Sequence, residues 1–190
     1  YFTNSSLQAT GGTVNISNCS PGALTAPSAA LVSAPRLVYG DATDTTVLTV
    51  GAMSAAQTAN ITTEIVFQAS NGIQFNGIFE SENGAVTLNP DGDGDLSGAV
   101  TFADGAGITS GGDLTLDAGY FGPESPVFNG SVAFRATRHL TVDRDLSVAG
   151  NLLLGADADG DGEGTLQIAT GRTVSVVGGG APGLSLLAPR

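Results

Sequence analysis

The amino-acid sequence predicts an all-β protein, a parallel β-helix with coils of about 20 residues. Three observations predict this fold. From about residue 60 onward, short runs such as EIVFQAS (64–70) and DLTLDAG (113–119) alternate apolar and polar residues, which is the period of a strand with one buried face. The chain contains 28 glycines and few aromatic residues among its 190 residues, which argues against a helical bundle. The third observation is a long-range internal repeat.

The segment 84–112 aligns without a gap on the segment 150–178. Val86 and Leu88 fall on Leu152 and Leu154 in this alignment. Runs of alternating residues also begin at steps of about 20 residues, a period that is typical of a solenoid. Coils of a β-helix lie about 4.8 Å apart, so we expect equivalent side chains to form ladders, with Leu154 above Leu88. An antiparallel β-sandwich is the alternative, but it predicts longer strands and no such register.

The first part of the chain follows the pattern less well. Residues 1–60 are predicted to form an irregular N-terminal capping segment with one candidate coil, and residues 61–190 the β-helix repeats. Prolines such as Pro27 and Pro35 cannot donate to a strand ladder. Residues 46–60 predict a strand followed by a short helical turn across the mouth of the solenoid.

Charge and composition restrict the partners. The formal net charge is −12 and all six basic residues are arginine, so no basic stripe exists for nucleic acid. No apolar run approaches the roughly 20 residues that a membrane helix needs. The single cysteine, Cys19, excludes an internal disulfide. An acidic surface without lysine suits a salty or cation-rich exterior, although it also serves ordinary solubility.

Two acidic loops, NPDGDGDLSG (89–98) and ADADGDGEG (156–164), are candidate calcium sites. Ca²⁺ binds six to eight oxygen ligands, and glycine permits the tight backbone around it. The spacing matches the opening of an EF-hand loop, but Val100 and Ile168 stand where its bidentate glutamate would be. The alternative is a solvated acidic turn. The candidate ligands are Asn89, Asp91, Asp93, Asp95, Asp157, Asp159, Asp161 and Glu163.

The offset between the two aligned segments also predicts where these loops lie. If it corresponds to three coils, both loops leave the same edge of the solenoid, about three times 4.8 Å apart. They would then form one acidic line that binds ions or bridges to a neighbouring molecule.

Catalytic chemistry has one weak candidate. His139, Arg135 and Asp143 could share one face of adjacent strands, although an exposed ion-pair cluster is the simpler interpretation. The excursion at residues 120–130 carries Tyr120, Phe121 and Phe128, which either contact a sugar or partner or fold back over the sheet. We predict no catalytic residues.

Two stretches of the chain carry a degenerate repeat pattern of apolar residues between small and polar ones. Its positions are Asn60, Ile61, Ile65, Phe67, Ala69 and Ile73, followed by Gly112, Leu114, Leu116, Ala118 and Gly119. In this pattern, residues 46–178 resemble the repeats of large secreted adhesins of the filamentous haemagglutinin type. The resemblance implies a right-handed β-helix, export from the cell and a role in adhesion or surface structure, without catalytic residues.

Together these observations predict a non-enzymatic extracellular or cell-surface protein, a fibre subunit that assembles end to end and is stabilised by Ca²⁺ at the acidic loops. Its predicted partners are other copies of itself or a larger surface assembly. A surface adhesin that binds a glycan or a protein receptor is the alternative. A polysaccharide-degrading β-helix enzyme is the second alternative, and neither nucleic-acid binding nor membrane insertion is predicted.

Overall fold

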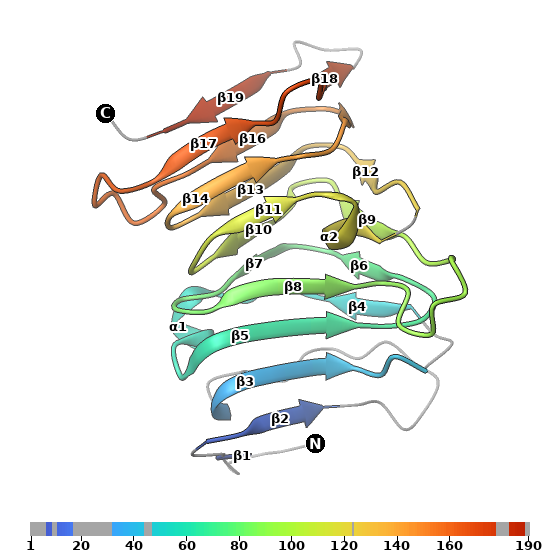
Figure 1. The fold of residues 1–190 in the computed structure, drawn as a ribbon, viewed down its shortest axis with the longest axis vertical. Coiled ribbons are helices and arrows are strands. Elements are labelled where there is room, and N and C mark those ends of the chain that lie inside the picture. The colour runs from blue at the N-terminus through green and yellow to red at the C-terminus, as the bar shows by residue number, and fades with distance from the viewer. Residues whose placement is uncertain are drawn as a thin grey trace.

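A computed structural model describes residues 7–8, 11–16, 32–43, 47–122, 124–177 and 183–188. Cys19 lies outside these residues. The fold is the predicted parallel β-helix, with about six turns of roughly 26 residues each. In Figure 1 the chain climbs from bottom to top, near strands run left to right and far strands run right to left, so the winding is right-handed.

The strands form three faces, and every named strand pair is parallel. The first face contains β1 (Leu7–Gln8), β2 (Thr13–Ile16), β3 (Val32–Gly40), β5 (Ile61–Gln68) and β8 (Ala85–Asn89), followed by β11 (Leu114–Leu116), β14 (His139–Val142) and β17 (Thr165–Ile168). The second contains β4 (Leu48–Val50), β6 (Ile73–Phe75), β9 (Val100–Ala103), β12 (Val127–Asn129), β15 (Leu146–Ala149) and β18 (Val174–Val177). The third contains β7 (Ile78–Glu80), β10 (Ala106–Ser110), β13 (Val132–Ala136), β16 (Leu152–Gly155) and β19 (Leu184–Leu187).

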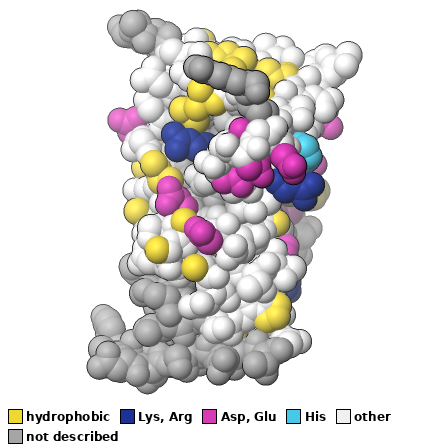
Figure 2. All heavy atoms as spheres, turned by 90° about the vertical axis from the view of Figure 1, so that its left-hand side faces the viewer, with side chains coloured by type: hydrophobic (Ala, Val, Ile, Leu, Met, Phe, Trp, Pro, Cys, Tyr) yellow, Lys and Arg dark blue, Asp and Glu magenta, His cyan; other side chains and the backbone are white. Residues whose placement is uncertain are grey.

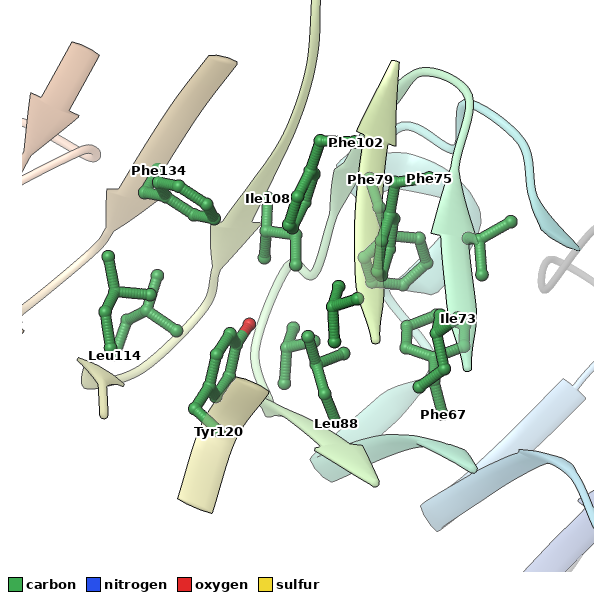
Figure 3. Packing of buried hydrophobic residues seen from close by; sticks show 14 of the residues in the cluster. Phe67, Ile73, Phe75, Phe79, Leu88, Phe102, Ile108, Leu114, Tyr120 and Phe134 are labelled. Atoms are coloured by element: carbon green, nitrogen blue, oxygen red, sulfur yellow. The ribbon is translucent and has the colours of Figure 1, made fainter. Parts of the chain in front are cut away.

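Ladders of apolar side chains fill the space between the three faces. Phe134 of β13 lies in register with Ile108 of β10 and Leu154 of β16, and all three are buried. Aromatic rings contact one another between coils and between faces; the rings of Phe75 and Phe102 stack with their centroids 5.1 Å apart (Figure 3). Each fully buried side chain contributes about 1.5–3 kcal/mol, so the ladders stabilise the solenoid without tryptophan.

The coils are longer than predicted because each complete coil contains three strands. The predicted step of about 20 residues joins strands of different faces. For example, β11 and β13 begin about one such step apart, yet they lie on two faces of the same coil. Short steps within a coil therefore shortened the apparent period.

The predicted ladder between Leu88 and Leu154 is wrong. Leu88 lies in β8 on the first face, in register with Phe67 of β5. Leu154 lies in β16 on the third face, in register with Phe134. The offset that carries Leu88 onto Leu154 is about two and a half turns of roughly 26 residues, so it moves the repeated sequence to another face.

The strand and helical turn predicted at residues 46–60 are present as β4 and α1 (Ala55–Thr58). Their predicted place across the mouth of the solenoid is wrong, because β2 and β3 continue the first face below them (Figure 1). The helix occupies a corner, where the buried Thr58 hydroxyl donates to the Glu80 carbonyl at 3.0 Å. The boundary at residue 60 stays a prediction.

Candidate functional site

The first acidic loop connects β8 to β9. Carboxylate oxygens of Asp91, Asp93 and Asp95 lie within 4.8 Å of one another. One oxygen of Asp91, Oδ1, is buried without a hydrogen-bond partner, whereas Asp93 and Asp95 are exposed. The Ser97 hydroxyl and backbone N–H donate to Asp95 and hold the pKa of this carboxyl below its usual 3.8. The loop therefore gathers three oxygens around a point that lacks a neutralising cation among the described residues.

Glycine allows this loop to lie against the coil below. The Gly92 N–H donates to the Ala69 carbonyl at 2.8 Å. A Cβ atom at Gly92 would lie only 2.5 Å from the Ala42 Cα, so a larger residue would push the loop away.

The second acidic loop connects β16 to β17 and gathers the carboxylates of Asp157, Asp159 and Asp161 within the same 4.8 Å. The Gly162 N–H donates to Asp157 at 2.9 Å, and Asp157 has a φ of 60°, which is unusual for a residue other than glycine. These contacts fold the loop back over its first aspartate.

Two of the predicted ligands are not part of these carboxylate clusters. Glu163 is exposed and lies outside the 4.8 Å cluster of the second loop, although its N–H donates to Asp161 at 2.8 Å. Asn89 is the last residue of β8, in register with Gln68 of β5. The structure therefore brings six predicted carboxylate ligands together, three in each loop.

The two acidic loops do not form one line. They leave opposite edges of the solenoid, the first on the right and the second on the left of Figure 1. Figure 2 faces the left edge and shows acidic side chains gathered beside arginine side chains and the histidine. The prediction of a shared edge is wrong because the offset between the loops is not a whole number of coils.

The three residues of the catalytic candidate are also separated. Arg135 lies on β13 and lines a groove of about 550 Å³, whereas His139 lies on β14 and lines a different groove of about 400 Å³. Asp143 accepts a hydrogen bond from Arg172 Nε at 2.9 Å. The predicted sharing of one face is wrong, because the chain turns a corner between β13 and β14.

The aromatic residues of the excursion at 120–130 face inward. Tyr120 and Phe121 lie in the short helix α2 (Ala118–Phe121), and both are buried. Figure 3 shows Tyr120 beside the core residues. Phe128 stacks on Phe102 with ring centroids 5.6 Å apart. Of the two interpretations, folding back over the sheet is confirmed.

The sequence did not indicate that β17 and β19, which end their sheets among the described residues, would expose apolar side chains. Leu184 and Leu186 of β19 lie in register with the buried Leu152 and Leu154, yet they are 44% and 51% exposed. Ile168 of β17 continues the ladder of Val142 and is 38% exposed. Figure 2 shows hydrophobic side chains gathered at this end. Their alternating pattern is the same as that of a buried strand, so the pattern alone could not find this surface.

Comparisons with known proteins add no relative. No family model, no curated protein and no solved structure matches the chain. Neither of the two short helices in the described ranges is long and apolar enough to cross a membrane.

Proposed function

We propose that this chain is a non-enzymatic, exported structural protein that assembles end to end through its last coil. The observation that carries this proposal is the exposed apolar surface of β17, β18 and β19. Each of these strands ends its sheet among the described residues. Large exposed apolar residues on them include Ile168, Val177, Leu184, Leu186 and Leu187.

An edge of this kind favours association. A terminal strand presents N–H and C=O groups that another strand can pair with. A second copy that stacks on the last coil would cover the open ladders and pair these backbone groups. Where the second copy presents its opposite end, the contact joins two different surfaces, so it does not close and leads to filaments. The net charge of −12 opposes the approach of two copies, so salt should strengthen association.

The test is the association state in solution. Sedimentation should show oligomers that grow with protein concentration and with salt. Leu186→Asp places a charge in the open ladder and should leave monomers. Ser185→Asp is the matched control, because Ser185 lies in register with Leu153 on the outer side of the same strand. A monomer at all concentrations and salt levels, or equal behaviour of both variants, would contradict the proposal.

We also propose that the two aspartate clusters bind Ca²⁺ and stabilise their loops. Three carboxylates within 4.8 Å repel one another unless a cation lies between them. Oxygen ligands of this kind suit Ca²⁺, and the partnerless Oδ1 of Asp91 is directed to no protein donor among the described residues. Because the loops lie on opposite edges, each would bind its own ion.

Calcium binding has a direct test in thermal unfolding. An ion at about 100 times its dissociation constant stabilises the protein by roughly 2.7 kcal/mol for each site. The triple variant Asp157→Asn, Asp159→Asn, Asp161→Asn should lose part of the calcium-dependent shift and keep the part due to the first loop. Identical unfolding curves with calcium and with a chelator would remove calcium from the proposal. Magnesium at equal ionic strength controls for screening.

The adhesin is the second candidate. It is favoured by a groove of polar side chains on the first face, which can contact a ligand while the ends of the solenoid are occupied. The polysaccharide-degrading enzyme has less support, since Arg135, His139 and Asp143 line different parts of the surface.

A further inference from the structure

The outer surface of the first face contains a groove of about 400 Å³ across three neighbouring strands, β11, β14 and β17 (Figure 1). We call it the polar groove. All the side chains that line it are polar: Asp113, Thr115, His139, Thr141, Thr165 and Gln167.

Register arranges these side chains in two rows. Thr115, Thr141 and Gln167 lie in one ladder, and His139 and Thr165 lie in the other. Neighbours in a ladder are about 4.8 Å apart, and the two rows are separated by two positions along the strand, about 6.6 Å. The rows run along the solenoid axis, so an extended ligand along that axis would meet new side chains at every coil.

The polar groups of this groove are available to a ligand. The side chains of Thr115, Thr141 and Thr165, together with those of His139 and Gln167, make no hydrogen bond or ion pair within the described residues, and all five are exposed or half-buried. Hydroxyl, amide and imidazole groups each offer both a donor and an acceptor.

The charge of the groove selects a neutral ligand. Asp113 is its one formal charge at neutral pH, and Arg138 lies 3.8 Å from this carboxylate. The net charge of −12 repels polyanions. An apolar ligand would cover free hydroxyls without pairing them, which is unfavourable. A chain of neutral sugars carries hydroxyl groups that both donate and accept, which matches the two rows.

We propose that the polar groove binds a neutral polysaccharide along the solenoid axis. Hydroxyls of successive sugars pair with the Thr115–Thr141–Gln167 row and the His139–Thr165 row. Because single hydrogen bonds add little net free energy in water, affinity comes from several coils acting together on one polymer. This inference deepens the adhesin candidate, which rests on the same groove, and does not depend on end-to-end assembly.

Affinity electrophoresis in native gels tests the proposal, because it detects weak binding to polymers. The probes are a neutral glucan, mannan and galactan in separate gels. Polygalacturonate serves as the anionic probe and gelatin as an extended polypeptide. We expect at least one neutral polysaccharide, and neither of the other two polymers, to retard the protein.

The variant Thr115→Val, Thr141→Val, Thr165→Val keeps the β-branched shape and removes the hydroxyls. It should bind at least about tenfold more weakly, since several hydrogen bonds are lost. Gln167→Ala, at one exposed position, should weaken binding less and serves if the triple variant folds poorly. Thr101→Val is the matched control, because Thr101 faces outward on β9 of the second face.

Three results would overturn the proposal. The first is no retardation in any neutral polysaccharide. The second is equal retardation of the wild type, the triple variant and Gln167→Ala. The third is equal or stronger retardation by polygalacturonate or gelatin, which would indicate a charged or peptide ligand. Sedimentation of the double variant Thr115→Val, Thr141→Val separates this site from end-to-end assembly. These two residues lie on β11 and β14 and not on the edge strand β17, so this variant should leave assembly unchanged while it weakens polysaccharide binding.

Discussion

The middle and the last coil of the solenoid have the same strand pattern and different surroundings. In the middle, Phe102 and Phe134 have neighbours above and below and are fully buried. In the last coil, Leu186 occupies the same inward position of its strand as Leu154 one coil below, yet half of it is exposed. Burial in this fold is thus decided by the presence of a neighbouring coil, and residue type alone does not determine it.

The largest expected change in the free energy of unfolding comes from comparing one inward-facing residue of the middle coils with one of the last coil. Phe102→Ala should lower the free energy of unfolding by about 3–5 kcal/mol, since it opens a cavity beside Phe75 and Phe134, whose rings lie 5.1 and 5.2 Å from that of Phe102. Leu186→Ala should cost less than about 1 kcal/mol in the monomer, because much of its side chain is already in water. Urea unfolding of dilute protein measures both. Similar losses would mean that the last coil is covered in solution.

A smaller effect concerns a polar atom inside the closed region. Tyr120 is buried and its hydroxyl has no hydrogen-bond partner among the described residues. Tyr120→Phe should therefore raise the free energy of unfolding by about 1 kcal/mol. The reverse change at the neighbouring ring, Phe121→Tyr, should lower it, because it adds a hydroxyl to a fully buried site. A loss of stability in Tyr120→Phe would show that this hydroxyl has a partner in solution.

The smallest expected change in the free energy of unfolding comes from comparing two ion pairs, each of which joins neighbouring coils. Glu64 accepts from Arg36 at 2.7 Å and from Thr87 at 2.6 Å, so one carboxylate connects β3, β5 and β8. The pair of Arg172 and Asp143 is 2.9 Å long and about half exposed near the open end. At pH 7, Glu64→Gln should cost about 0.5–1 kcal/mol and Arg172→Gln less than about 0.5 kcal/mol.

The pH dependence of the Glu64 effect has a definite sign. Partial burial raises the pKa of Glu64, but the hydrogen bonds from Thr87 and Arg36 outweigh it and bring the pKa below 4.5. A lowered pKa means that the stabilisation is present above the unfolded pKa and is lost as the pH falls through the folded value. The difference between wild type and Glu64→Gln should shrink on acidification below about pH 4. A constant difference down to pH 2 would contradict this assignment.

Much of the fold could be predicted because the relevant information is local. Alternation in runs such as AVTLN and HLTV indicates one buried face, and glycine-rich breaks indicate turns. Coil length could not be obtained in the same way. It depends on which strands share a face, and strands of different faces, such as β11 and β13, have the same pattern.

The same division applies to the candidate sites: their local features could be predicted from the sequence, and their positions on the solenoid could not. The aspartate clusters are short-range features, and the structure places Asp91, Asp93 and Asp95 together as their spacing suggests. Their position on the solenoid is a long-range property and was predicted wrongly. The polar groove was missed because its side chains come from three strands that belong to successive coils and lie far apart in the chain.

The spacing between the two acidic loops has a geometric consequence for any longer rod with this winding. When a loop recurs every two and a half turns, successive copies lie on opposite sides of the solenoid. Each further unit of that length would therefore place its loop opposite the previous one. Lengthening or shortening the spacing by half a turn, about 13 residues, would bring all copies of the loop to one side of the solenoid. The spacing between copies of a loop thus sets the direction in which an extended solenoid displays its charge.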